Sequence, residues 1–321
     1  MLKNLNLLVI LFLIFSLTGC SLPPGYYGKK QLAMQETVPE PDPAVLPDQP
    51  VPSIPAAAVT VSEPAPAVVE EKLPEGTSPG LKKFAIGEQL VFSIRWMGLE
   101  AGRTTVTIKE IVKVNGRDTY HIEAFSRTTY VLDLLFRIRD YHDSYVDCEN
   151  FYTHRFVKRA AEGTITYDET NDFDYEKNKA YYVNKKKNHT KTTDLPGKMQ
   201  DIVSVSYWFR TQNVKVGDTV KTYLHSDEKN YDVSIKVLKK ENFNIPGKGN
   251  VPMMVIEPKA KRGIKEYKKG RAKIWVTDDE ERLPLFVEAH VIYAGALNIV
   301  LVSHEKVNPV PAPSGQGVNG A

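Results

Sequence analysis

The distribution of proline separates the part of this chain that can fold from the parts that cannot. Thirteen of the 21 prolines lie between Pro23 and Pro79, and three more lie in the last 13 residues. Proline fixes φ at about −65° and has no N–H to donate, so these stretches favour extended polyproline II and cannot build a core. A core must therefore form within residues 81–308, which are enough for one sizeable domain.

The first 20 residues have the pattern of a lipoprotein signal peptide. Lys3 supplies a positive charge, and residues 7–15 form an unbroken apolar run. Nine helical residues rise about 14 Å, less than half of the roughly 30 Å hydrocarbon core, so the run does not predict a membrane-spanning helix. The sequence Leu17-Thr18-Gly19-Cys20 resembles the bacterial lipobox, in which the cysteine is acylated and the chain is cut just before it.

This resemblance implies that Cys20 anchors the mature chain in a membrane. Fatty acyl chains such as palmitate at this cysteine give more than the two signals that stable anchoring needs. In lipoproteins of this type an aspartate after the cysteine tends to mean retention in the inner membrane. Ser21 stands there, so the resemblance favours the outer membrane, with the domain on its periplasmic face. The alternative is an ordinary signal peptide with a chance cysteine.

Four segments follow from these two patterns. We expect residues 1–19 to be the signal peptide and residues 20–80 to be the lipidated cysteine with a disordered, proline-rich spacer. Residues 81–308 are expected to form a β-rich periplasmic domain, and residues 309–321 a disordered tail. A proline-rich ligand for a partner domain is the alternative interpretation of the spacer. Nucleic acid is not an expected partner in the periplasm.

From Gly87 onward apolar residues recur with the period of two that is typical of β-strands. Four apolar side chains share one face of the first segment: Leu90, Phe92, Ile94 and Trp96. Asn115-Gly116 then separates two alternating segments, a strong hairpin signal because both residues tolerate positive φ. Further strand-like segments cover residues 136–145, 151–167, 173–183, 219–225, 231–238, 251–258, 273–277, 283–291 and 297–302. The spacing predicts an all-β fold, a single curled antiparallel sheet (a half-open barrel of about 10–12 strands).

One segment departs from this period and follows helical spacing. Its apolar positions are Met199, Ile202, Val203 and Phe209, and Pro196-Gly197 stands just before it. We therefore expect one short amphipathic helix over about 198–212, packed on the sheet.

Three anchors in the same order resemble a family of bacterial envelope proteins, domain of unknown function 3108. The first anchor is residues 87–102, and the last is the hairpin of residues 270–284. The middle anchor is the helix pattern Asp201, Ser204, Tyr207 and Arg210. The last hairpin is also faintly similar to one in Lol-type lipoprotein carriers and receptors, which are half-open antiparallel barrels with helices plugging an apolar mouth.

These similarities favour a domain that binds an apolar or lipid-like envelope molecule in the curled sheet. The candidate lining residues are Leu90, Phe92, Ile94, Trp96, Trp208 and Trp275. The alternative is a non-catalytic structural or assembly lipoprotein that contacts an envelope protein and has a filled interior. A carrier needs an apolar cavity of roughly 300 Å³ or more, whereas a scaffold is packed to ordinary density.

No sequence motif of catalysis or cofactor binding is present, so we expect neither an enzyme nor a cofactor or metal site. Asp140 and His142 share a strand face and offer two metal ligands. Arg137 and Arg139 lie beside them, however, and favour an ion-paired outer face.

Three other features have simple structural interpretations. Residues 278–281 are four acids between two strands, the pattern of a solvated turn. The eight cations between Lys259 and Lys273 either protect strands from edge pairing or contact anionic envelope groups. Cys148 is the thiol that remains beside Cys20, and we expect it to be buried and unreactive.

Overall fold

The computed structural model describes residues 71–72, 84–245, 249–263, 265–266, 270–291 and 295–306. The signal peptide, Cys20, nearly all of the spacer and the C-terminal tail lie outside the described residues, so the predictions for them stay predictions. Neither helix of the described part has the length and apolar character that crossing a bilayer requires.

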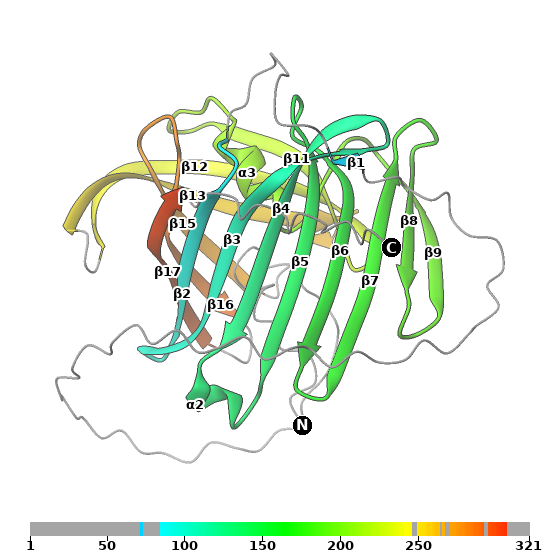
Figure 1. The fold of residues 1–321 in the computed structure, drawn as a ribbon. Coiled ribbons are helices and arrows are strands. Elements are labelled where there is room, and N and C mark those ends of the chain that lie inside the picture. Colours follow the sequence, from blue (N-terminus) through cyan, green and yellow to red (C-terminus); the bar gives the residue numbers. More distant parts are fainter. Residues whose placement is uncertain are drawn as a thin grey trace, which may run out of the picture. The chain divides into compact units, whose positions relative to one another are not determined.

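Seventeen strands form one continuous, curled sheet in which nearly all neighbours are antiparallel (Figure 1). The strands are β1 (Glu71–Lys72), β2 (Glu88–Trp96), β3 (Leu99–Val114), β4 (Arg117–Thr128), β5 (Ile138–Asp147), β6 (Thr153–Glu162), β7 (Ile165–Asp174), β8 (Lys179–Asn184), β9 (His189–Asp194), β10 (Met199–Gln200), β11 (Thr219–Ser226), β12 (Lys229–Ile245), β13 (Gly249–Arg262), β14 (Lys265–Glu266), β15 (Gly270–Thr277), β16 (Pro284–Val291) and β17 (Gly295–Lys306). Two short helices, α2 (Tyr130–Asp133) and α3 (Ser204–Arg210), complete the described elements. The predicted all-β fold with a single curled antiparallel sheet is confirmed.

The strands outnumber the predicted 10–12 because β1, β9, β10 and β14 were not predicted and two predicted segments contain three strands, β6 to β8. Gly163 has φ of 60° and turns the chain between β6 and β7, within the segment predicted as one strand. Asn178, with φ of 52°, does the same between β7 and β8. The turn at Asn115-Gly116 is confirmed, with φ of 53° and 74°. It was predictable because Asn and Gly both tolerate the positive φ that such a turn requires.

The strand order places the two ends of the domain side by side. The last strand, β17, pairs with β2 from Leu297↔Trp96 to Lys306↔Glu88. From β2 the sheet continues strand by strand to β9, and on the other side it runs back through β16 and β15 to β11 and β10. The chain therefore crosses from one sheet edge to the other between β9 and β10, and α3 follows this crossing.

The two sheet edges meet through side chains. Lys191 and His189 of β9 lie 3.3 and 3.4 Å from the carboxylate of Glu228, in the turn between β11 and β12. Asn230 Nδ2 also donates to the carbonyl oxygen of Asp194 at 2.6 Å. Among the described strands no backbone ladder joins β9 to β11 or β12, so the sheet remains open.

The first long strand shows how one bulge redirects a side chain. Leu90, Phe92 and Ile94 are at most 3 % exposed and belong to the main hydrophobic core. A β-bulge then shifts the register with β3 between Ile94 and Arg95. As a result Trp96 does not share their buried face, and it is 41 % exposed.

The helix is shorter than the predicted span of 198–212. Met199 and Gln200 pair in parallel with β11 as β10 instead. The Asp201 carboxylate then accepts hydrogen bonds from the backbone N–H groups of Val203 and Ser204, and regular helix begins at Ser204. The helical spacing therefore located the element, but an aspartate that binds free N–H groups sets its start.

The inner face of the sheet, on the side of α3, changes character along the strand order. Over β5 to β8 it carries buried polar residues: Asp140, His142, Lys158, Glu162, Asn171 and Asn184. The interpretation of the Asp140 segment as an ion-paired outer face is wrong for Asp140 and His142, which are fully buried. It holds for Arg139, which pairs with Asp133 at 2.5 Å. The alternation of side chains along a strand separates its two faces but does not say which of them is buried. Both faces of β5 carry polar residues, so hydrophobicity did not identify the buried face.

A candidate binding site beside helix α3

A buried carboxylate fixes the start of α3 to the sheet. Asp201 accepts hydrogen bonds from Ser144 Oγ on β5 at 2.5 Å and from Thr153 Oγ1 on β6 at 2.7 Å. Its other oxygen accepts the two backbone N–H groups at the start of the helix. Burial raises the pKa of Asp201, and these hydrogen bonds oppose that shift. The first turn of α3 is therefore held by one side chain that bonds two strands.

A buried ion pair fixes the end of the same helix. The Arg210 guanidinium makes two hydrogen bonds of 2.8 Å to the Glu88 carboxylate at the start of β2. Its Nε donates to the carbonyl oxygen of Glu281 at 3.0 Å, and its plane lies over the ring of Phe84. Burial by itself would raise the pKa of Glu88, but the bonds and charge of Arg210 hold that pKa below its usual value. Both ends of the helix pattern Asp201 to Arg210 thus anchor α3 on the sheet.

An apolar cavity of about 80 Å³ lies between α3 and the sheet. The helix contributes Val205, Ser206 and Phe209 to its lining, and all other lining residues except Arg282 are apolar sheet or turn residues. The lining strands run from β11, which carries Leu224, to β2, which carries Phe92, so the cavity lies over one half of the sheet. The cavity thus lies where the inner face is apolar, away from the buried polar residues of β5 to β8.

An open polar cleft of about 500 Å³ borders the same helix and strand. Its lining residues in the described part of the chain are Arg117, Asn150, Tyr152, Lys198, Gln200, Trp208 and Thr222. Trp208 belongs to α3, and Thr222 stands two residues before the cavity residue Leu224 on β11. An apolar cavity and a polar cleft therefore adjoin α3.

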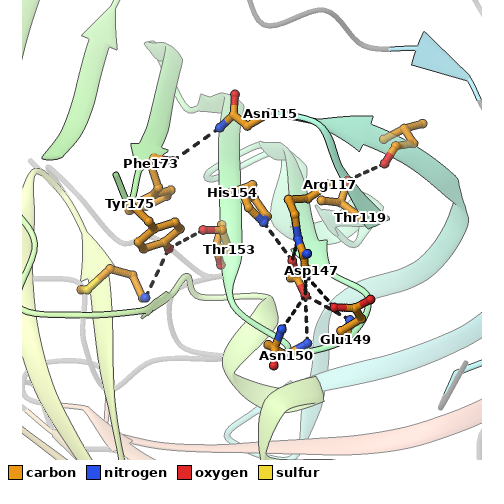
Figure 2. Close-up of polar contacts among 12 residues, drawn as sticks. Asn115, Arg117, Thr119, Asp147, Glu149, Asn150, Thr153, His154, Phe173 and Tyr175 are labelled. Carbon is orange, nitrogen blue, oxygen red and sulfur yellow. Dashed lines mark hydrogen bonds and ion pairs between the residues drawn. The ribbon is translucent and has the colours of Figure 1, made fainter. Parts of the chain in front are cut away.

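Asp147 organises the wall of the cleft (Figure 2). Its buried Oδ2 accepts a hydrogen bond from Arg117 Nε at 3.0 Å, and His154 Nε2 lies 3.1 Å away. Its Oδ1 accepts the backbone N–H groups of Glu149 and Asn150. Burial would raise the pKa of Asp147, but these partners hold it well below its usual range. The carboxylate therefore stays ionised and holds Arg117 at the cleft.

Lys198 supplies a second cation on an aromatic support. Its Nζ lies 4.1 Å from the ring centroids of both Tyr152 and Tyr175. Tyr175 is fixed by a 2.5 Å hydrogen bond from its hydroxyl to the carbonyl oxygen of Thr153 (Figure 2). Burial lowers the pKa of Lys198, while the charge of Asp147 raises it. No carboxylate of the described residues forms an ion pair with Lys198, so its N–H donors remain available to an anion.

The sequence between β2 and β17 matches a family model described as a protein of unknown function (DUF3108), over residues 91–302. The chain belongs to the DUF3108 family. This confirms the resemblance of the three sequence anchors, two of which now have structural roles. The helix pattern anchors α3, and the last hairpin supplies Ile274, Val276 and Pro284 to the cavity of the DUF3108 domain.

Two solved structures are similar to the DUF3108 domain at low sequence identity. One is a beta-barrel-like protein of domain of unknown function DUF1849 from Brucella abortus, at 11% identity and a TM-score of 0.47, covering 70% of this chain and 98% of that one. The other is a Bacteroides fragilis protein described as a candidate exported protein with a YmcC-like fold, at 11% identity and a TM-score of 0.27, covering 69% and 97%. A search of curated proteins finds no significant match.

The six candidate lining residues of the DUF3108 domain have separate locations. Phe92 lines the apolar cavity and Trp208 the polar cleft. Leu90 and Ile94 lie in the core, and Trp96 is exposed beyond the bulge. Trp275 lies on the opposite sheet face. It packs there against Phe243 and Phe286, at centroid distances of 4.9 and 5.3 Å, and donates from Nε1 to Glu241 at 2.8 Å.

The cleft residues Arg117, Tyr152 and Lys198 were not singled out in the sequence. Arg117 on β4 and Tyr152 before β6 meet through the pairing of β4, β5 and β6. Lys198, before β10, joins them because the segment that leads into α3 bonds to Thr153 on β6. No motif or spacing joins them. The one available signal was Asp147, which stands near the acidic segment of β5.

The remaining sequence features are placed as follows. Cys148 is buried, as predicted. Residues 278–281 form the predicted solvated turn, in which Asp279 Oδ1 accepts the backbone N–H groups of Glu281 and Arg282. Among the described basic residues, Lys259, Lys261, Arg262, Arg271 and Lys273 are exposed on β13 and β15. The described residues contain no group of three or more His, Cys, Asp or Glu arranged to hold a metal ion.

Proposed function

We propose that the DUF3108 domain is a non-catalytic binding module that takes one amphiphilic, lipid-like envelope molecule beside α3. The apolar end of the ligand enters the cavity under Val205 and Phe209, and its anionic end lies in the cleft near Lys198. The observation that carries this proposal is that an apolar cavity and a cationic, aromatic-lined cleft border the same helix. Ligand sites combine apolar lining with a few placed polar groups in this way.

The volumes of the cleft and the cavity determine how much of the ligand each of them can hold. The cleft, at about 500 Å³, falls within the range of about 300–1,000 Å³ that is usual for small-molecule sites. The cavity, at about 80 Å³, accepts only the end of an apolar chain. Both ends of α3 are anchored by buried polar groups, so the helix does not offer a wide opening.

A second candidate function is a structural or assembly lipoprotein that acts through protein contacts. The size of the apolar cavity favours it, because about 80 Å³ is below the roughly 300 Å³ expected of a carrier that encloses a whole ligand. The two functions differ in one measurable property. A binding module retains an amphiphile in solution, whereas a scaffold with a filled interior does not.

Filling the cavity should weaken amphiphile binding without unfolding the domain. Ser206→Leu extends apolar volume into the cavity, so we expect the affinity for dodecyl phosphate to fall about tenfold with an equal or higher melting temperature.

Lys198→Met removes the charge in the cleft while keeping a long side chain over the tyrosine rings. It should weaken dodecyl phosphate about tenfold and leave dodecanol nearly unchanged. Isothermal titration below the critical micelle concentration measures both affinities.

Two exposed substitutions serve as controls for this experiment. Thr190→Leu adds an apolar side chain on β9, and Lys185→Met removes a lysine charge in the turn before it. Neither should change either affinity. If neither amphiphile binds, and native mass spectrometry of the protein purified from cells finds no retained molecule, the binding module is excluded and the scaffold remains.

We also propose that acylated Cys20 holds this module at the periplasmic face of the outer membrane. The support is the lipobox at residues 17–20 and Ser21 after it. The wild-type chain should stay with outer membranes after a carbonate wash, whereas Cys20→Ala should be soluble or unprocessed. Ser21→Asp should move the protein to the inner membrane. Immunoblots of separated membranes measure all three. A Cys20→Ala protein that resists the wash like the wild type would show that the anchor lies elsewhere.

A further inference from the structure

Large apolar side chains are exposed at one end of the sheet. Eleven such side chains are exposed in the described part of the chain, and seven of them come from two neighbouring segments. We call these seven the apolar tip: Trp96, Met97 and Leu99 around the turn between β2 and β3, and Tyr130, Val131, Leu134 and Leu135 in and after α2. Leu135 and Met97 are more than 80 % exposed. Such a concentration on one surface is a mark of an interaction site.

The two segments of the apolar tip are adjacent in space. The backbone N–H of Thr129 donates to the carbonyl oxygen of Ala101 at 3.0 Å, and its Oγ1 donates to that of Glu100 at 3.4 Å. Figure 1 shows α2 at the lower end of β4 and β5, near the turn between β2 and β3. Helix α2 has only four residues, none of which is buried. The exposed leucines of the apolar tip, Leu134 and Leu135, follow directly after this helix.

Arginines surround this tip without enough acids to neutralise them. Arg103, Arg127 and Arg139 stand directly opposite one another across β3, β4 and β5. Like charges in such cross-strand positions destabilise a sheet. Arg103 pairs with Glu100, and Arg139 pairs with Asp133.

The central arginine of this row, Arg127, is exposed and has no ion pair with a described residue. The same holds for Arg95 and Arg137, which flank the two segments of the tip. Three cations at one end of the sheet thus remain open to an external anion.

We propose that this end of the domain docks on an anionic lipid bilayer, with the apolar tip in the interface and the arginines among the headgroups. Protruding leucines with an aromatic residue such as Trp96 or Tyr130 match the boundary between headgroups and acyl chains. Unpaired arginines match the negative surface potential of a bilayer that contains anionic lipids. Arg95, Arg127 and Arg137 are spread over one end of the sheet, so complementary charges must also be spread over a surface. The anionic headgroups of a bilayer meet this requirement, and we therefore select a bilayer as the occupant. This docking is independent of a ligand beside α3.

The test uses the chain from Ser21 to Ala321, which lacks the proposed lipid anchor, and a single cooperative thermal transition first shows that it is folded. Its binding to phosphatidylcholine vesicles with and without phosphatidylglycerol is measured by flotation. We expect binding to the anionic vesicles and little to the neutral ones. Leu134→Ser combined with Leu135→Ser should lower the anionic partition coefficient about tenfold. Arg127→Gln should lower it severalfold, with an unchanged melting temperature in both cases.

A matched control removes exposed apolar side chains away from the tip. Val216→Ser combined with Val302→Ser should leave the partition coefficient unchanged. The proposal is overturned if the wild-type chain does not float, if it binds both vesicle types equally, or if the leucine substitutions have no effect. A dimer in light scattering that the same leucine substitutions abolish, without vesicle binding, would instead assign the tip to contacts between protein copies.

Discussion

Replacing Arg210 by alanine should lower the free energy of unfolding by about 3–5 kcal/mol, the range for removing one partner of a buried ion pair. Both side chains are nearly buried, and the two hydrogen bonds of 2.8 Å would be lost together. Glu88 would then remain inside the protein without a cation of permanent charge among these partners, with His304 Nε2 at 3.2 Å from its carboxylate and the Tyr207 hydroxyl nearby. Because small domains have only about 5–15 kcal/mol of total stability, this loss should be visible in any denaturation curve.

Urea denaturation at neutral pH measures this effect, and an exposed pair provides the control. Arg103 pairs with Glu100 on the surface at 2.6 Å, with the arginine side chain 53 % exposed. Exposed pairs contribute at most about 1 kcal/mol, so Arg103→Ala should have a small effect. Equal losses for Arg103→Ala and Arg210→Ala would show that the buried pair does not stabilise α3.

A double variant separates the ion pair from the packing around it. Replacing Arg210 by methionine and Glu88 by leucine removes both charges together and keeps apolar volume at the two positions. Such replacements of buried pairs are often neutral or stabilising, whereas removal of one partner is not. The double variant should therefore recover much of the stability lost in Arg210→Ala. It would still lack the bond to Glu281, so α3 should be less firmly held.

Backbone conformation was the part of the fold that the sequence predicted best. Asn115-Gly116 specified a hairpin because its positive φ values are a local property. The helix was found at the correct place, yet its start depended on hydrogen bonds from Asp201 to β5 and β6. Those bonds connect residues about 50 positions apart in the chain, and periodicity over one segment contains no information about them.

The candidate site was less predictable than the fold for the same physical reason. Phe92 and Trp208 were selected as apolar and aromatic, and the structure places them in different halves of the site. Arg117 and Lys198 gain their position only from Asp147 and the two tyrosine rings. Charged residues are common on strands, so these two could not be distinguished from other surface cations before the pairing of the strands was known.

The buried carboxyl group of Asp140 should make the domain less stable as the pH rises. Burial raises the pKa of Asp140 from 3.8 to about 7, and repulsion from Glu162 adds to this, while Lys158 and the Ala161 backbone oppose it. Neither carboxyl oxygen has a hydrogen-bond partner of good geometry in the described structure. The neutral acid is therefore the form that the folded state accepts.

The sign of the effect follows from proton binding in the two states. Between pH 4 and 7 the unfolded chain has released the Asp140 proton while the folded domain still holds it. Stability therefore falls with rising pH over this window, by at most about 4 kcal/mol for a shift of about three pH units. Above pH 7 both states are ionised, and the loss no longer grows.

Asp140→Asn should remove this dependence, because the amide has the same shape and no charge. Urea denaturation at pH 5 and pH 8 should show a smaller loss of stability in the variant, which becomes more stable than the wild type at pH 8.

Asp143 on the same strand provides the opposite control. It faces outward and bonds Arg159 and His121, and these partners keep its pKa lowered although burial alone would raise it. Its stabilising contribution is present at neutral pH and lost in acid. Asp143→Asn should therefore destabilise the domain at pH 8. If Asp140→Asn keeps the wild-type pH slope, the Asp140 carboxyl is already ionised in the folded protein at pH 5, and the polar inner face of β5 to β8 must solvate its charge.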